Sequence, residues 1–365
     1  MFRSPQCRFL LAALFTLALF AGSEPRARAQ AQDAPLTSQE LVRLLYQLPK
    51  HPEMRDEIIN QLRRRGIGFE LTDGLRSVVA TKSGSDALLR RTLEEAARRR
   101  LNPTASVLPS EAEGAELLKR ARVATSAAAE AMPDFIVKQQ IRRSFSRGGL
   151  NNWIDQDRLT IAVSYRANAG EEYRLLAVNG LPTGKDARDG GSYEEAGGTI
   201  STGEYVSMLA ALFKEETRTQ FKMVDTDLLR GRRTIVYEFE VKQQFSRQSI
   251  KAASAGNRVV VTGYRGRIWI DRETYRVLRL EDISTEIPED FPISAASSVI
   301  DYDWVTINER PYLLPSLAEI KLTASINGQT IQTRNEIRFR GYQKFGTEVK
   351  IIEDIGDEDE KDGKP

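Results

Sequence analysis

The sequence of 365 residues contains one cysteine, Cys7, and one histidine, His51. Cys7 lies before an apolar run near the N-terminus, so the chain beyond it can form no disulfide and offers no thiolate. A lone histidine, in a predicted loop between Pro49 and Pro52, excludes a Ser-His-Asp or Cys-His site on the later, β-rich part of the chain. It also excludes a zinc site built from two or three histidines. We predict that His51 is a solvent-facing loop residue.

Sequence motifs of common enzymes are lacking as well. Neither G-x-S-x-G nor S-x-x-K occurs in the chain. The segment Gly180–Lys185 looks like a phosphate loop, but it is one residue too short, and Asp186 stands where the motif needs serine or threonine. The sequence therefore predicts no cofactor, no metal and no catalytic residue.

The chain also lacks a hydrophobic run long enough to span a membrane. Its longest apolar run, Phe9 to Ala21, has about 13 residues, whereas a spanning helix needs about 20. Arg3 and Arg8 precede this run, and Ala27–Ala29 follows it with an A-x-A pattern, as in a cleaved signal peptide. We predict a signal peptide over residues 1–29, cleaved near Ala29, and a periplasmic or secreted protein with no membrane span. An uncleaved anchor is the alternative.

Positive and negative charges nearly balance over most of the chain. The formal net charge is +2, and Met1–Ala29, with four arginines and Glu24, carries +3 of it. What remains is slightly acidic, so the composition predicts no nucleic-acid partner. The segment Glu353–Pro365 has seven acidic residues and two lysines, which is typical of a disordered acidic tail over 353–365.

A small helical module is predicted over residues 36–102. Thr37–Glu40 forms a capping box for the first of four short helices, and Thr72 and Ser85 are suitable N-caps for the third and fourth. Two arginine clusters, 63–65 and 98–100, fall at helix ends, where cations interact favourably with the helix dipole. Docking of a partner is the alternative reading of these clusters.

Residues 103–109 are the predicted linker to a second domain over 110–352. Ser110 and Glu113 form a capping box for an alanine-rich helix that ends near Ala131. From Asp134 the hydrophobic period changes to two, with one inserted helix after a third capping box at Ser201–Glu204. We predict about ten strands, the last from about Tyr342 to Ile352. The fold class is α+β: a helical bundle, then a curved antiparallel half-barrel with covering helices.

Paired acids and aromatic residues are the candidate site residues. The pairs Asp155/Asp157, Asp225/Asp227 and Asp301/Asp303 lie two apart on predicted strands, so each pair is expected to share a solvent face. Aromatic and aliphatic residues on strands either fill the core or line an apolar cavity in the concave face of the sheet. As ligand-lining residues we predict Trp153, Phe221, Tyr237, Phe239, Trp269, Leu278, Leu280, Trp304 and Phe339.

One hairpin carries a family resemblance. Gly266–Leu280 reads GRIWIDRETYRVLRL, and it resembles the "G-x-hydrophobic-x-hydrophobic-D-x-x-T" hairpin of the periplasmic lipoprotein-carrier fold of the LolA/LolB type. The resemblance covers about residues 110–352. It implies a non-enzymatic protein that holds a lipid or a lipidated partner in an incomplete barrel. The helical module and the acidic tail depart from that single-domain pattern.

Three functions are therefore considered. The first is a periplasmic binding protein for a lipid or lipoprotein. The alternative is an envelope interaction or sensor protein whose helical module docks a partner protein. The third is an enzyme that acts through carboxylates, for which the sequence suggests no substrate.

Overall fold

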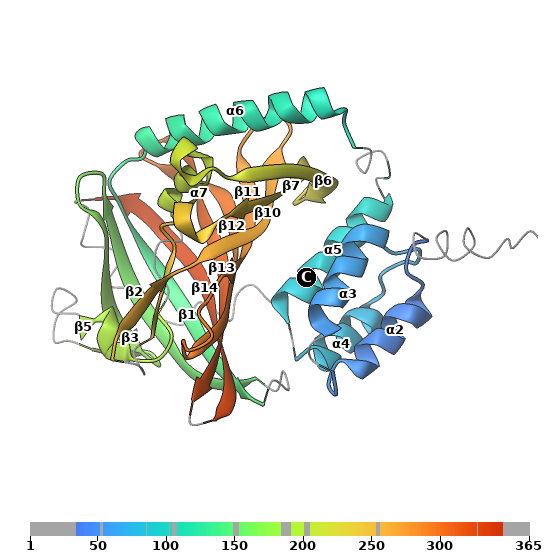
Figure 1. The fold of residues 1–365 in the computed structure, drawn as a ribbon, viewed down its shortest axis with the longest axis horizontal. Helices are drawn as coiled ribbons and strands as arrows, with labels where there is room; N and C mark the ends of the chain where they lie inside the picture. The colour runs from blue at the N-terminus through green and yellow to red at the C-terminus, as the bar shows by residue number, and fades with distance from the viewer. Residues whose placement is uncertain are drawn as a thin grey trace, which may run out of the picture.

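A computed structural model describes residues 34–345, apart from 52–53, 85, 102, 104–107, 149–152, 184–190, 201–204, 253–255 and 327. The predicted signal peptide, most of the predicted linker, the caps at Ser85 and Ser201 and the acidic tail lie outside the described residues. The described elements form a helical module beside a large curved sheet, with two further helices on the other side of that sheet (Figure 1).

The helical module consists of four helices and its own apolar core. The helices are α2 (Ser38–Gln47), α3 (Met54–Arg65), α4 (Asp73–Lys82) and α5 (Ala87–Leu101). The predicted capping box is present at α2, because Thr37 accepts from the Glu40 backbone and Glu40 accepts from that of Thr37. Leu41, Ile58 and Leu89 meet in the core, as expected for one apolar stripe on each helix.

A 12-stranded antiparallel sheet forms the second part. Its order is β4-β3-β2-β1-β14-β13-β12-β11-β10-β7-β6, and β5 pairs with β3. The strands are β1 (Phe135–Arg147), β2 (Ile154–Arg166), β3 (Gly170–Val178), β4 (Leu181–Pro182), β5 (Gly191–Ser192), β6 (Gln220–Leu229), β7 (Arg232–Val241), β10 (Gly263–Asp271), β11 (Val277–Thr285), β12 (Ile293–Ile307), β13 (Arg310–Ile326) and β14 (Gln329–Lys344). Edge strands β4 and β6 do not pair, so the curved sheet is an open half-barrel.

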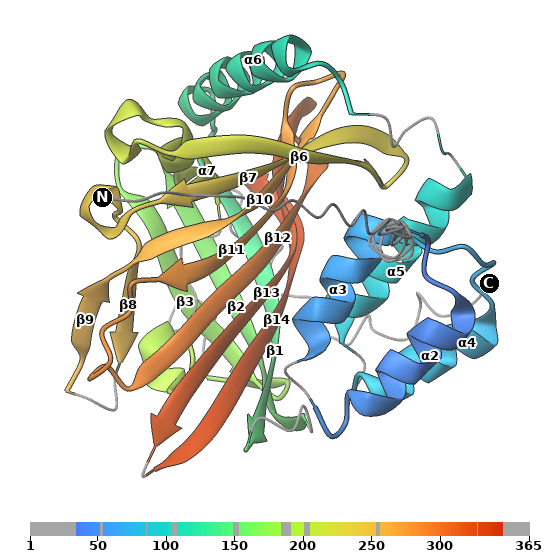
Figure 2. The same ribbon diagram turned by 45° about the vertical axis from the view of Figure 1, so that its right-hand side comes forward.

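Smaller elements complete the β-rich part. A two-stranded sheet joins β8 (Ser249–Ala252) to β9 (Arg258–Val261). Helix α6 (Glu111–Glu130) lies along one end of the half-barrel, and α7 (Val206–Phe213) lies against its concave face (Figures 1 and 2). Single-turn 3₁₀ helices are η2 (Tyr193–Ala196), η3 (Glu215–Thr217) and η4 (Gln243–Phe245).

The predicted fold class is confirmed: a helical bundle is followed by an open, curved antiparallel sheet with covering helices. One strand differs from the prediction. Two strands were expected on either side of Gly341, but β14 runs without a break from Gln329 to Lys344. Gly341 adopts a φ of +65°, which is irregular for a strand. The strand continues through this irregularity, whereas the sequence pattern predicted that it ends there.

Gly266 permits an unusually close approach of β10 and β11. A Cβ atom added at this position would lie 1.8 Å from the Glu281 carbonyl oxygen. This oxygen belongs to the backbone of the paired strand β11, so it cannot move aside as a flexible side chain could. The packing of β10 against β11 therefore requires glycine at the first residue of the hairpin Gly266–Leu280.

We expect Gly266→Ala to lower the free energy of unfolding by roughly 1–3 kcal/mol, because the added methyl forces the two strands apart. Gly74→Ala is the matched control. Its Cβ meets only Thr72 Oγ1, at 3.9 Å, and alanine favours the helix by about 0.5–1 kcal/mol. Urea unfolding measures both changes. An unchanged midpoint for Gly266→Ala contradicts the packing described.

Candidate functional site

The concave face of the half-barrel is an apolar and aromatic floor against which α7 packs. Tyr205, just before α7, lies 5.6 Å from the rings of Phe135 and Phe339, measured between ring centroids. Phe213, at the end of α7, stacks on Phe221 of β6 at 5.5 Å. Leu212 is fully buried among them. Side chains of α7 therefore fill the central part of the half-barrel.

Helix α6 covers one end of this floor through a narrow stripe of small residues. Only Gly114, Leu117, Ala121 and Thr125 are buried along its 20 residues. The Tyr237 hydroxyl donates to the Gly114 carbonyl oxygen at 2.7 Å, and burial raises the pKa of Tyr237 to about 12. The alanine-rich helix thus packs closely on the sheet over about three turns, from Gly114 to Thr125.

Seven of the nine predicted lining residues belong to one apolar core cluster, and six of these, all but Trp269, lie on the concave side. The six are Phe221, Tyr237, Phe239, Leu278, Leu280 and Phe339. Phe239 packs edge-on against Tyr264 at 5.8 Å, and Leu278 and Leu280 alternate with charged residues of β11. The floor that the sequence predicted is therefore assembled in one place, beneath α6 and α7.

The three tryptophans lie elsewhere. Trp269 is on the face opposite to its neighbour Ile268, and its ring lies 5.3 Å from the Arg63 guanidinium of α3. Trp153 lies under Arg334 at 4.5 Å and near Lys321, which bonds to the helical module. Trp304 is 38% exposed. The prediction grouped them with the floor because alternation fixes which residues share a face but not which face is concave.

The convex face of the sheet carries a buried ion-pair network that holds the helical module. At its centre Arg279 of β11 meets Glu95 of α5, with 2.6 Å between Nη1 and Oε1. Arg279 Nε also donates to Asp301 Oδ1 of β12 at 2.7 Å. The three side chains are at most 3% exposed. Arg91 of α5 forms an ion pair with the same aspartate, so two strands and one helix share these charges.

Trp269 joins this network to the ends of α3 and α5. Its Nε1 donates to Asp227 Oδ2 at 3.0 Å, and Arg99 lies 3.6 Å from that carboxylate. The Arg99 guanidinium donates to the carbonyls of Leu62 and Arg63 at 2.9 Å. These carbonyls belong to the last turn of α3, where a cation is favourable. The arginine clusters therefore do interact with a helix end, and they also pair with the sheet.

A second cluster fixes the other end of the module. Asp86, next to the start of α5, accepts from Arg55 Nε at 2.6 Å and from the Leu89 backbone at 2.8 Å. Lys321 of β13 lies 3.3 Å from Asp86 and 3.1 Å from Glu319. Burial opposes the charge on Asp86, but Arg55 and Lys321 outweigh that effect and lower the pKa of Asp86. Arg63 adds an ion pair with Glu281 of β11.

The carboxylate pairs have structural partners. Asp155 and Asp157 bond to Arg142 and Arg143 at 2.7 and 2.5 Å. The expected solvent face is wrong for Asp227 and Asp301, which are 4% and 2% exposed. They lie beneath the helical module, which the alternation pattern of a single strand does not reveal. Among the described residues no group of three or more His, Cys, Asp or Glu side chains is placed to hold a metal.

Two clefts open between the module and the convex face. One, of about 610 Å³, lies between α4, α5 and strands β13 and β14. The other, of about 630 Å³, lies between α3 and strands β6, β7, β10 and β11. Arginines and carboxylates line both. Such surfaces can bind charged groups through ion pairs.

The comparisons with known proteins give structural likeness only. No protein-family model and no curated protein matches the chain. It is similar to a LolA superfamily protein from Nitrosomonas europaea, with 10% identity, 61% of this chain and 92% of that one covered, and a TM-score of 0.32. A DUF1329 family protein from Desulfovibrio piger shows 8% identity, coverage of 63% and 94%, and a TM-score of 0.29.

A further solved structure, described as an outer membrane lipoprotein-sorting protein domain from Vibrio parahaemolyticus, shows 11% identity, coverage of 63% and 92%, and a TM-score of 0.30. At TM-scores near 0.3 these likenesses carry no argument about ligand or activity. No helix of the described residues is long and apolar enough to cross a bilayer.

We expect Arg279→Met to lower the free energy of unfolding by about 3–5 kcal/mol, because Glu95 and Asp301 lose their shared buried partner. The control is Arg142→Met, whose partner Asp155 is 57% exposed; removing such a surface pair costs about 1 kcal/mol or less. Equal losses for the two variants in urea unfolding contradict a buried network.

The network also predicts acid sensitivity. Burial opposes the charge on Asp301, but Arg279 and Arg91 overcome it and hold the pKa of Asp301 at about 2, below its ordinary value of 3.8. A carboxyl with a depressed folded-state pKa stabilises the fold above pH 4, and this contribution is lost as the pH falls through 2. The shift corresponds to about 2 kcal/mol.

We therefore expect the unfolding free energy to fall between pH 4 and pH 2, with a shallower fall in Asp301→Asn. Urea titrations at pH 5, 4, 3 and 2 measure it. Parallel pH profiles for the parent and Asp301→Asn would show that Asp301 does not contribute.

Proposed function

We propose that the chain is a non-enzymatic binding protein that holds the apolar chain of a lipid or lipidated partner on the concave face of its half-barrel. The observation that supports this is α7. Seven of its eight residues, VSMLAALF, are apolar, and the segment packs along an aromatic floor. The position of α7 is the one that an acyl chain would take in this sheet.

Binding by this route requires exchange. The floor is filled in the described structure, so an incoming acyl chain has to displace α7 from Leu212, Phe213 and their neighbours. The acyl chain and α7 bury the same apolar surface of the floor. The free energy needed to replace one by the other is therefore smaller than the free energy needed to expose that surface to water. At the C-terminal end of α7, Thr219 Oγ1 donates to the Leu212 carbonyl oxygen at 2.7 Å.

Export agrees with this function. The sequence predicts a signal peptide over Met1–Ala29, and such a signal directs a protein to the periplasm or outside the cell, where lipids and lipoproteins move between membranes. The alternative, an envelope partner docked by the helical module, has less support. Arg63, Arg91 and Arg99 are cations of the module that face the sheet, and each pairs with the sheet of the same chain.

The first test asks whether the purified protein contains bound lipid. Mass spectrometry of lipids extracted from protein purified from the periplasm should find acyl lipids in stoichiometric amounts. Titration with the fluorescent fatty acid cis-parinaric acid should then give saturable binding of one molecule per chain.

A variant that loosens α7 tests the exchange. Leu212→Ala removes a buried side chain, at a cost of about 2–5 kcal/mol to packing. If the acyl chain displaces α7, the packing that Leu212→Ala has already lost no longer has to be broken on binding. The affinity for cis-parinaric acid should therefore rise about tenfold, which corresponds to about 1.4 kcal/mol. Val123→Ala, on the exposed side of α6, should leave affinity unchanged.

Circular dichroism should show that both variants are folded. Absence of saturable binding in parent and variants, together with a lipid-free extract, contradicts the proposed function. Unchanged affinity in Leu212→Ala shows instead that the acyl chain binds without displacing α7.

A further inference from the structure

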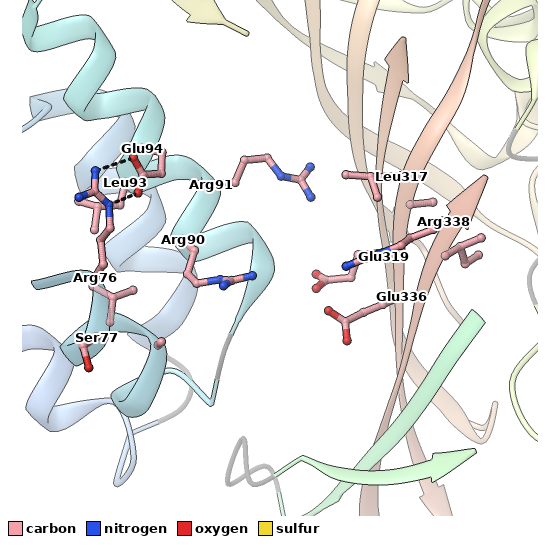
Figure 3. A pocket seen from close by; sticks show the side chains of 14 residues that line it. Arg76, Ser77, Arg90, Arg91, Leu93, Glu94, Leu317, Glu319, Glu336 and Arg338 are labelled. Atoms are coloured by element: carbon pink, nitrogen blue, oxygen red, sulfur yellow. Dashed lines mark hydrogen bonds and ion pairs between the residues drawn. The ribbon is translucent and has the colours of Figure 1, made fainter. Parts of the chain in front are cut away.

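Buried carboxylates in the described part of the chain are paired with cations, with one exception. Seven of them have an arginine or lysine nitrogen within 3.6 Å: Asp86, Glu95, Asp227, Asp271, Glu281, Asp301 and Glu319. Figure 3 shows one of them, Glu319, where β13 faces α5. The exception is Asp282 of β11, which forms no ion pair with a described residue.

Asp282 is held by two neutral donors. It is 4% exposed. Ser298 Oγ donates to its Oδ1, and Gln248 Nε2 donates to its Oδ2 at 3.2 Å. Burial raises the pKa of Asp282, and the two hydrogen bonds lower it by less. Each carboxylate oxygen can accept two hydrogen bonds, so both oxygens can accept a further donor, and a cationic donor would offset the cost of burying the charge.

Two more acceptors lie beside this carboxylate. Gln248 Oε1 and Ser284 Oγ are buried and have no hydrogen-bond partner among the described residues. Gln248 contacts Asp282 directly, and Ser284 lies two residues further along β11, on the same face. An ammonium group has three N–H donors and no acceptor. The acceptors of Asp282, Gln248 and Ser284 therefore match an ammonium group.

A row of residues across the concave face connects Asp282 to the floor beneath α7. The successive register partners on β6, β7, β10, β11 and β12 are Phe221, Phe239, Gly266, Asp282 and Ser298. At one end of this row, Phe221 stacks on Phe213 of α7. Neighbouring strands lie ~4.8 Å apart, so Asp282 is about 14 Å from Phe221 across the sheet. An acyl chain that replaces α7 can therefore extend along the row and end at Asp282.

We propose that Asp282 binds the ammonium group of an acyl lipid whose chain lies over Phe221 and Phe239. The ligand class is thus a lipid with a primary amine in its headgroup. This inference rests on the proposed function and adds to it the polar group that the site selects. Gln248 is half-buried, so the headgroup reaches the carboxylate when one side chain near the surface moves aside.

Displacement of cis-parinaric acid by two competitors of equal chain length tests the proposal on the protein purified from the periplasm. Decylamine carries an ammonium group at pH 7, and 1-decanol carries no charge. We expect decylamine to bind the parent about tenfold more tightly, as for a hydrogen bond to a charged group. The preference should disappear in Asp282→Asn, which keeps the shape of the side chain and removes its charge. An unchanged affinity for 1-decanol shows that this variant is folded.

Two lysophospholipids extend the comparison to headgroups. Lysophosphatidylethanolamine has a primary amine, and lysophosphatidylglycerol has none. Only displacement by the first should weaken in Asp282→Asn. The control variant is Asp303→Asn, which removes an exposed carboxylate of β12. It should leave both preferences unchanged, because it changes the net charge by the same amount at a distance from the site.

The outcomes separate this inference from the proposed function. Equal affinities of the parent for decylamine and 1-decanol overturn the inference and leave the proposed function intact, and so does an amine preference that survives Asp282→Asn. An effect of Asp282→Asn confined to a palmitoylated peptide with a free lysine overturns the assignment to a lipid headgroup. If neither cis-parinaric acid nor any competitor binds, the proposed function and this inference both fail.

Discussion

Arg279 is a buried contact between the helical module and the sheet. Arg279 lies on the convex face of the sheet between Glu95 of the helical module and Asp301 of the neighbouring strand. A charge on that face would cost several kcal/mol if it were covered without a partner. The sheet therefore has to receive a module that supplies opposite charges at the right positions, and α5 supplies both Glu95 and Arg91.

Such a network specifies geometry more than it adds stability. Desolvation of the ions offsets most of their attraction, but a displaced module would leave several charges unpaired at once. Arg99, which binds both the end of α3 and Asp227, extends the same constraint to the junction of two helices. The module is thus fixed in one orientation by charges, whereas its own interior is apolar.

The two faces of the sheet have consequently different properties. The convex face is charged and pairs with the helical module. The concave face is apolar and aromatic, and a short apolar helix packs against it. In the proposed function a ligand exchanges on the concave face while the convex face keeps the sheet in place.

Much of this architecture could be predicted from the sequence. Helix caps such as Thr37 and the period-two strands gave the fold class, and alternation along β7 and β11 brought Tyr237, Phe239, Leu278 and Leu280 together. The network was missed because alternation at Arg279 and Glu281 resembles an ordinary solvent face. Only the three-dimensional position of α5 turns that face into an interface, and Trp269 lies on the same face, next to Arg63. The arginine clusters of α3 and α5 were the available signal, since they match acidic positions on the sheet.

A double-mutant cycle between Glu95→Gln and Arg279→Met measures the central contact most directly. The unfolding free energies of the parent, both single variants and the double variant give the coupling between module and sheet. Groups in one buried network couple by about 0.5–3 kcal/mol, and we expect a value in the upper half of that range. Additive effects, with a coupling close to zero, would show that the module is held by something other than this network.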